Sequence, residues 1–237
     1  MPTLRQALGS PSGNVSVAFR LGYRSGRVPS LPVDGTAAGG LRTASLSLRN
    51  WMALRRGNSF NLNVVAIGSD AFTGAMWTAV DQIVHRMREV YAQIGIGVRV
   101  VQFVDVPVAQ ARGLDIITTD DEIDDLRDTW VVQNSGIDMF VPAGWSPPDG
   151  ILGRSPVDGE CPGDKEEGIG LGIASPLLAP RTAAHEIGHY LSLEHSQDLP
   201  HTLMCQTGSA TQPTWNSVAF TTGQVEDVRD HCMVEDS

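Results

Sequence analysis

The chain has 237 residues, and 41% of them are hydrophobic, which is enough for one large domain with a buried core. Its net charge of −10 is unevenly placed, because residues 1–58 hold eight arginines and one acidic residue whereas the remainder is strongly acidic. No stretch is long and apolar enough to span a membrane, so we expect no membrane partner. The arginines come without an aromatic or glycine-rich recognition motif, so nucleic acid binding is not favoured. The sequence does not indicate an oligomeric state.

Residues 1–58 are rich in Ser, Gly, Pro and Arg, which predicts an irregular basic extension or pro-segment with one or two strands before a domain at 59–237. Asp34 precedes Gly35 and is interpreted as a turn residue. The first ten residues lack the apolar run of a signal peptide. Either the protein is cytoplasmic or exported by a non-standard route, or this sequence is not the full precursor.

The next segment predicts a strand, a helix and a second strand. Phe60–Ile67 alternates and ends at Gly68, as a strand does. Ser69 and Asp70 can cap a helix. Apolar residues at helical spacing follow them: Phe72, Met76, Val80, Ile83, Met87, Val90, Tyr91 and Ile94. Gly97–Val106 is apolar almost throughout, which predicts a strand buried on both faces. This order of elements predicts a parallel pair with a crossover helix.

Short strands at 114–118 and 137–141 flank a helix that begins near Asp120 and runs to about Val131. Acidic residues suit its first turn, and their spacing lacks the EF-hand pattern, so we interpret them as a solvated face. The stretch from 142 to 167 is predicted to be a loop. It holds a set of candidate calcium ligands: Asp158, Glu160, Asp164, Glu166 and Glu167.

The three cysteines do not define a disulfide framework. In one alternative, Cys205 pairs with Cys232 and leaves Cys161 unpaired. In the other, all three are thiols. The chain is predicted to end in a helix that Thr221 or Thr222 caps.

One motif in the second half predicts a metal site. His185 and His189 lie four residues apart, so on a helix both imidazoles can reach one metal ion. Glu186 then projects beside the metal, where it can act as a base toward a metal-bound water. If the helix ends near Ser192 and the chain turns, His195 returns as a third ligand. Three protein ligands leave a fourth position for water, which is typical of a catalytic zinc.

The stretch from Gly168 to Cys205 resembles the metzincin metalloprotease signature, H-E-x-x-H-x-x-G-x-x-H followed by a Met-turn at Met204, and it is most similar to the matrixin-like branch. The resemblance implies an α+β fold with a twisted mixed sheet and two long helices at 59–195. A smaller subdomain at 196–237 would hold the Met-turn and end in a helix. The resemblance also implies that residues 168–174 form an edge strand, which can bind an extended peptide.

The resemblance further implies a zinc-dependent endopeptidase that acts on protein or peptide substrates. The three histidines would hold Zn²⁺, Glu186 would be the general base, and Met204 would lie beneath the metal. Calcium is a second candidate cofactor. One alternative is a catalytically inactive zinc-binding or regulatory protein on the same fold. Another is a different HExxH hydrolase with Glu194 or Asp198 as third ligand, while His201 is a weaker substitute for His195.

Position 192 departs from the family pattern, because it is Ser where the family has Gly. Glycine there allows the left-handed conformation that ends a helix sharply. A serine in that conformation costs roughly 1 kcal/mol. We therefore expect a positive φ at Ser192, and we expect Ser192→Gly to relieve strain. No Tyr follows Met204 directly, so the extra tyrosine ligand of some metzincins is not supported.

Overall fold

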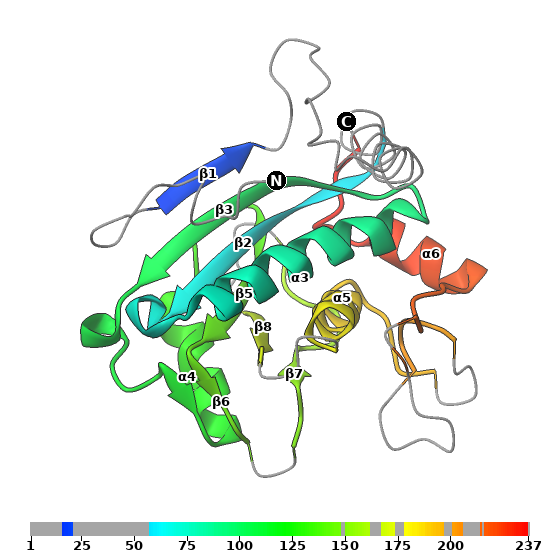
Figure 1. Cartoon of the computed structure of the whole chain (residues 1–237). Coiled ribbons are helices and arrows are strands. Elements are labelled where there is room, and N and C mark those ends of the chain that lie inside the picture. Colours follow the sequence, from blue (N-terminus) through cyan, green and yellow to red (C-terminus); the bar gives the residue numbers. More distant parts are fainter. Residues whose placement is uncertain are drawn as a thin grey trace, which may run out of the picture.

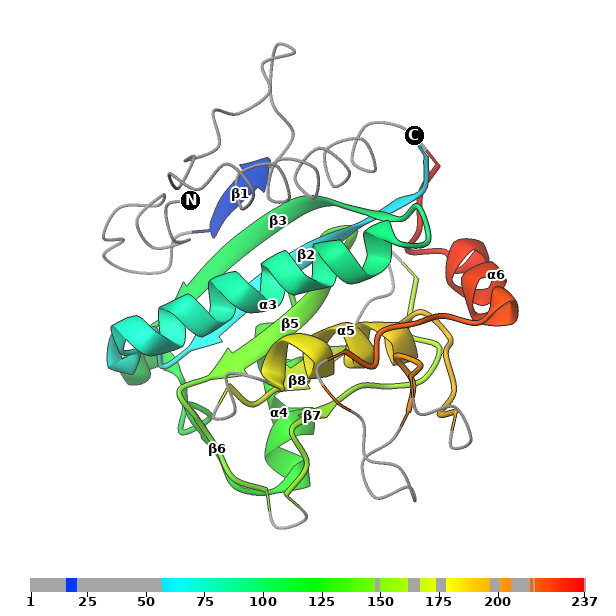
Figure 2. The same ribbon diagram turned by 45° about the vertical axis from the view of Figure 1, so that its right-hand side comes forward.

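The computed structural model describes residues 16–20, 57–147, 150–161, 167–173, 178–196, 201–205, 214 and 216–236. Within them, the main sheet has six strands in the order β1-β3-β2-β5-β8-β7 (Figures 1 and 2). Their bounds are Ser16–Arg20 (β1), Gly97–Val106 (β3), Ser59–Ile67 (β2), Gly136–Pro142 (β5), Gly168–Leu171 (β8) and Gly153–Arg154 (β7). The four inner strands run parallel, and β1 and β7 are antiparallel to their neighbours. The predicted twisted mixed sheet is confirmed.

Four α-helices lie in the described part of the chain: α3 (Gly74–Ala92), α4 (Asp120–Trp130), α5 (Ala179–Tyr190) and α6 (Thr222–Asp230). Short 3-10 helices occur at Ser69–Ala71 and Val108–Gln110. The two-residue strands β4 (Ile116–Ile117) and β6 (Gly144–Trp145) pair in a separate small sheet. None of the described helices has the length and apolar character that a membrane crossing requires.

The crossover between β2 and β3 is formed by α3, as predicted, and the two strands are parallel. The predicted cap was wrong. Ser69 and Asp70 belong to a 3-10 turn, and the N-cap of α3 is Thr73, whose side chain accepts the N–H of Met76 in the first turn. The reason is that the backbone at Phe72 is extended, so the chain has to start a new helix after it. Most of the predicted apolar stripe is buried, whereas Met76 and Ile94 are partly buried against the same core.

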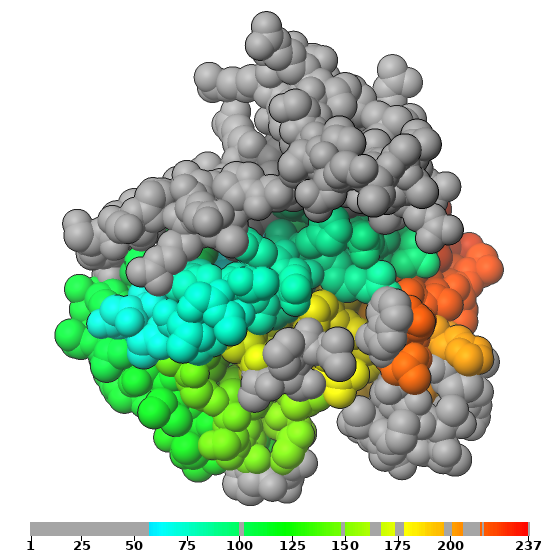
Figure 3. All heavy atoms as spheres, in the orientation of Figure 1, coloured from blue at the N-terminus to red at the C-terminus, as the bar shows by residue number. Residues whose placement is uncertain are grey.

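Alternate side chains of the central strands fill two cores on opposite faces of the sheet. Leu62 and Val64 belong to the core that α3 and α5 cover. Val65 and Ile67 belong to the second core, which includes residues of α4. In the space-filling view, α3 lies across one side of the molecule with yellow atoms of α5 directly below it (Figure 3). A sheet buried on both faces is a rigid base for α5.

The edge strand lies elsewhere than predicted. Residues 168–174 were expected at the sheet edge, but β8 pairs with β5 on one side and with β7 on the other. β7 was missed because it falls in the expected loop and is only two residues long, too short to show a period of two. The strand beside α5 at the edge of the described sheet is therefore β7.

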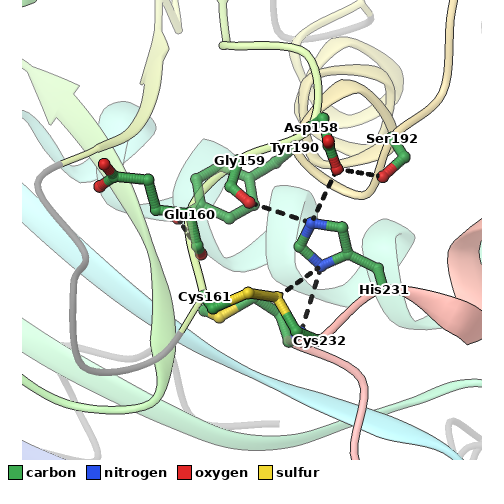
Figure 4. The surroundings of a disulfide bond; sticks show 9 residues. Asp158, Gly159, Glu160, Cys161, Tyr190, Ser192, His231 and Cys232 are labelled. Atoms are coloured by element: carbon green, nitrogen blue, oxygen red, sulfur yellow. Dashed lines mark hydrogen bonds and ion pairs between the residues drawn. A yellow bond between two sulfur atoms is a disulfide. The ribbon is translucent and has the colours of Figure 1, made fainter.

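The cysteines pair differently from both predicted alternatives. Cys161 forms a disulfide with Cys232 (Figure 4), and Cys205 is buried and is not part of a disulfide. Cys232 lies just after α6 at the surface, beside the loop that holds Cys161, whereas Cys205 packs inside the core next to α5. The predicted C-terminal helix is confirmed, with Thr221 as its N-cap.

Part of the N-terminal prediction lies outside the described residues, including Asp34. Within residues 1–58, β1 pairs antiparallel with β3, so at least one of the expected strands forms. Of the candidate calcium ligands, Asp164 and Glu166 also lie outside the described residues. Calcium binding and the division at residues 58 and 195 stay predictions.

Candidate metal centre

Three histidines converge at the C-terminal end of α5. His185 and His189 lie one turn apart on this helix, as their spacing predicted, and Pro180 occupies its first turn. The chain turns after Tyr190 and brings His195 back to them. One ligand atom from each histidine lies within 4.8 Å of the others, and no other cluster of three possible ligands occurs among the described residues. Glu194 and His201 are exposed and outside the cluster, and Asp198 lies outside the described chain.

Two backbone carbonyls orient the first two imidazoles. Nδ1 of His185 lies 2.8 Å from the carbonyl oxygen of Leu203, and Nδ1 of His189 lies 2.6 Å from that of Leu193. A carbonyl oxygen can only accept, so Nδ1 carries the proton and the Nε2 lone pair is left for a metal. Nε2 of His189 lies 3.0 Å from Nε2 of His195. Nitrogens on a tetrahedral zinc lie about 3.3 Å apart, so the donor set fits zinc.

The histidines are also in the charge state that a metal requires. Burial lowers the pKa of His185 to about 3, and the nearby Arg181 charge acts in the same direction. Burial lowers the pKa of His189 to about 4, with a further contribution from His195. The pKa of His195 is lowered as well, mainly by burial. All three are neutral at pH 7 and need to release no proton before they bind a metal.

Glu186 is buried beside the first histidine. Burial raises the pKa of its carboxyl group to about 8, and the positive charge of Arg181 opposes the rise. The strand β7 passes close to the carboxyl group of Glu186. A methyl group added at Gly153 would lie 2.8 Å from Cγ of Glu186 and 3.0 Å from Cγ2 of Thr182. Glycine at 153 therefore lets the edge strand approach the carboxylate directly. Nothing in the sequence indicated this contact.

The turn that returns the chain to His195 is a Schellman motif. Leu193 donates its N–H to the carbonyl of Gly188 at 2.9 Å, and Ser192 donates its N–H to the carbonyl of His189 at 3.0 Å. Ser192 occupies the position that glycine usually takes, with φ of 74°. The expectation of a left-handed Ser192 is confirmed.

Comparisons with known proteins identify solved structures that have a similar fold. No protein-family model matches the chain, and no curated protein sequence matches it. The structure is similar to metalloproteinase-II from Bacteroides fragilis, with a TM-score of 0.51 and 15% identity over 74% of this chain. It is also similar to archaemetzincin from Methanopyrus kandleri, with a TM-score of 0.46 and 16% identity over 73% of this chain and 95% of that one. The present chain spans 53% of the Bacteroides protein, and the fold assignment rests on that first similarity.

The fold is similar to that of a metalloproteinase. Its helix α5 also carries a buried arginine that was not predicted from the sequence. Arg181 lies one turn before His185 and is 5% exposed. Its Nη2 donates to the carbonyl oxygens of Leu203 at 2.5 Å and Cys205 at 2.6 Å. Its Nε donates to the carbonyl oxygen of Ser217 at 3.4 Å. The contact of Arg181 with the surroundings of His185 could have been predicted from their spacing, because residues four positions apart lie on one face of a helix.

Met204 packs against the same helix. It is fully buried, and a methyl group added at Gly188 would lie 2.7 Å from its sulfur atom. The chain turns around it, with the N–H of Cys205 donating to Thr202 at 3.3 Å. Gly188 lies between the two helical histidines in sequence, so Met204 contacts α5 close to both of them.

Proposed function

We propose that this protein is a zinc-dependent endopeptidase of the matrixin-like branch of the metzincins, acting on protein or peptide substrates. The observation that carries the proposal is the convergence of three neutral imidazoles, two of them with Nε2 left for a metal, next to a buried glutamate. A purely structural zinc site has no use for that glutamate, and it usually has four protein ligands.

His185, His189 and His195 would hold the zinc. When bound there, zinc supplies a Lewis acid that polarises the scissile carbonyl and makes a water more acidic. The positive charge of zinc bound beside Glu186 would lower the pKa of its carboxyl group from the value of about 8 that burial gives it. The resulting carboxylate would take a proton from the attacking water and pass it to the nitrogen of the leaving amine. One C–O bond forms and one C–N bond breaks, so the products are a carboxylic acid and an amine. The carbonyls of Leu203 and Leu193 keep the first two imidazoles in the required tautomer.

An extended substrate would bind along β7. This strand pairs with β8 on one side, and at Gly153 it passes directly over Glu186. Main-chain groups on the outer side of an edge strand can pair with a peptide. A peptide added there would lie next to the proposed base, which supports cleavage within a chain.

Two alternatives can be separated from this function by variants. An inactive zinc-binding or regulatory protein would bind zinc without turnover. A hydrolase with Glu194 as an acidic third ligand is not favoured, because Glu194 lies outside the histidine cluster. Asp198, the other acidic candidate, lies outside the described residues. If either acidic residue were the third ligand, His195→Ala would leave the zinc content unchanged.

The test is a digest of a denatured protein mixture by the purified full chain loaded with zinc, read by mass spectrometry. We expect new peptide termini that disappear with a zinc chelator. Glu186→Ala should keep one zinc per chain and lose activity by about two to four orders of magnitude, whereas His189→Ala should lose the zinc. No cleavage by the zinc-loaded parent would favour the inactive alternative, and an unchanged metal content in His189→Ala would rule out the site.

We also infer that the protein works in an oxidising compartment. The support is the disulfide between Cys161 and Cys232, because such bonds are rare in reducing cytosol. This favours export over a cytoplasmic location. The mass of the intact protein isolated with its thiols blocked would test it, since a reduced pair would be two blocked thiols heavier.

A further inference from the structure

The left-handed serine of the turn after α5 has a specific partner. Ser192 donates its hydroxyl to Oδ1 of Asp158, with 2.6 Å between the oxygen atoms (Figure 4). A hydrogen bond to a carboxylate is stronger than one between neutral groups. This bond links the turn to a loop that lies more than thirty residues earlier in the chain.

The same loop also binds the backbone at the end of the helix. Asp158 donates its N–H to the carbonyl of His189 at 3.0 Å, and Gly159 donates its N–H to that of Tyr190 at 2.9 Å. The carbonyl of His189 also accepts the N–H of Ser192, so the loop gives it a second donor and supplies a donor to the carbonyl of Tyr190. Asp158 is itself left-handed, with φ of 62°. Three hydrogen bonds therefore join the loop to the end of α5 and its turn, and one of them links the two left-handed residues directly.

The loop is held from its other side by the C-terminal segment. His231 is buried and lies with Nε2 3.1 Å from the carbonyl of Gly159, while its Nδ1 accepts the N–H of Met233 at 3.2 Å. The disulfide of Cys161 and Cys232 adds a covalent link (Figure 4). These bonds fix the loop independently of Ser192, so Asp158 is a stationary acceptor for it.

Ser192, Asp158 and His231 are not a nucleophilic triad, although the residue types match one. The hydroxyl of Ser192 goes to the carboxylate, and the imidazole donates to a backbone carbonyl. In a triad, the imidazole is the group that takes the serine proton. The arrangement is therefore suited to holding a conformation.

The turn that Asp158 binds controls two elements of the metal centre. The residue after Ser192 is Leu193, whose carbonyl accepts the Nδ1 proton of His189. Two residues further on, His195 reaches Nε2 of His189. A shift of the turn would thus misplace one ligand and release the orientation of another.

We propose that Asp158 is a positioning residue of the metal centre. Its carboxylate holds Ser192 in the left-handed turn and so places Leu193 and His195. The inference rests on the zinc site of the proposed function. It explains how a serine serves at a position where the turn favours glycine.

The experiment removes this hydrogen bond without straining the backbone. Glycine adopts positive φ readily, so Asp158→Gly and Ser192→Gly each keep the local conformation and lose one end of the bond. Asp158→Asn is the matched control, because asparagine tolerates the left-handed region and keeps an acceptor oxygen. The zinc affinity of each full-length variant is measured by competition with a chromophoric chelator. The absorption spectrum of the Co²⁺-loaded protein reports the ligand geometry.

We expect Asp158→Gly to bind zinc about three- to tenfold more weakly, which is the size of effect that one hydrogen bond gives. Ser192→Gly should lose less, because glycine also favours the left-handed turn. In the Ser192→Gly background Asp158→Gly should cause no further loss, and Asp158→Asn, which keeps a neutral acceptor, should bind zinc more tightly than Asp158→Gly. Should Asp158→Gly fail to fold, Asp158→Asn compared with the parent, with and without Ser192→Gly, gives the same test. Parent-like affinity in Asp158→Gly, or a further loss when it is combined with Ser192→Gly, would overturn the inference. A parent that binds no zinc would instead refute the proposed function.

Discussion

Arg181 and His185 share one hydrogen-bond acceptor, the carbonyl oxygen of Leu203. The guanidinium donates to it at 2.5 Å and the imidazole Nδ1 at 2.8 Å. The two donors lie one turn apart on α5, and a carbonyl oxygen has two lone pairs, so both bonds can form together. The arginine thereby fixes the group that orients the first proposed zinc ligand.

Arg181→Met should lower the free energy of unfolding, because the change leaves buried carbonyls without their donor. We expect a loss of about 1–3 kcal/mol, measured by urea unfolding of the zinc-free protein. Arg86→Met is the control, since Arg86 makes a partly exposed ion pair with Glu89 on α3 and should cost at most about 1 kcal/mol. Equal effects in the two variants would contradict the role given to Arg181.

Gly188→Ala should destabilise the protein, because the new methyl group would lie 2.7 Å from the sulfur of Met204 in a buried contact. Overpacking of this kind costs about 1–3 kcal/mol. Gly223→Ala provides the comparison, since Gly223 lies in α6 with no atom within 4 Å of an added methyl group. That change should be neutral or stabilising by up to about 1 kcal/mol. Thermal melts of both variants would reveal whether Met204 packs against α5 as described.

Ser192 can be tested for stability as well as for metal binding. Relief of left-handed strain by Ser192→Gly is worth roughly 1 kcal/mol. The lost bond to Asp158 costs about as much, so the gain expected from the sequence should largely vanish. Ser192→Val should melt well below both, because a β-branched residue tolerates positive φ poorly. A neutral valine variant would mean that the turn is not left-handed in solution.

The disulfide should contribute strongly to stability, since it joins residues 71 positions apart. Restricting an unfolded loop of this length stabilises the folded state by roughly 4 kcal/mol in the chain-entropy treatment. Replacing Cys161 and Cys232 together by serine should lower the melting temperature, and a reducing agent should lower that of the parent in the same way. The reductant should have no effect on the double variant, and any effect there would point to Cys205.

His231 should make stability depend on pH. Burial lowers the pKa of this imidazole in the folded state below its ordinary value of 6.5. Below pH 6.5 the unfolded chain therefore binds more protons at this position, and the stabilisation, fully present above that pH, is lost as pH falls toward the folded pKa. His231→Gln should reduce the slope of unfolding free energy against pH in this range. Both proteins are measured with a chelator present, so that the other histidines contribute equally. Identical slopes would mean that His231 is not buried as a neutral group.

The parts of the protein that depend on local spacing could be predicted from the order of the residues alone. The burial of α3 follows from apolar residues every three or four positions, and the parallel β2 and β3 follow from the two apolar runs around it. The facing of His185 and His189 is a property of any helix. The left-handed Ser192 could be predicted because the motif that the sequence resembles has Gly at this position, where the chain turns toward His195.

Three other features depend on contacts between distant segments and are seen only in the folded structure. The edge strand β7 has two residues and no period of its own, and it forms only because β8 lies beside it. Cys161 pairs with Cys232 because two surface loops meet there, which no spacing of cysteines encodes. Asp158 resembles any acidic loop residue in the sequence, and it becomes the partner of Ser192 only through the fold. Periodicity and turn chemistry act between neighbours in the chain, whereas these three features arise from packing across it.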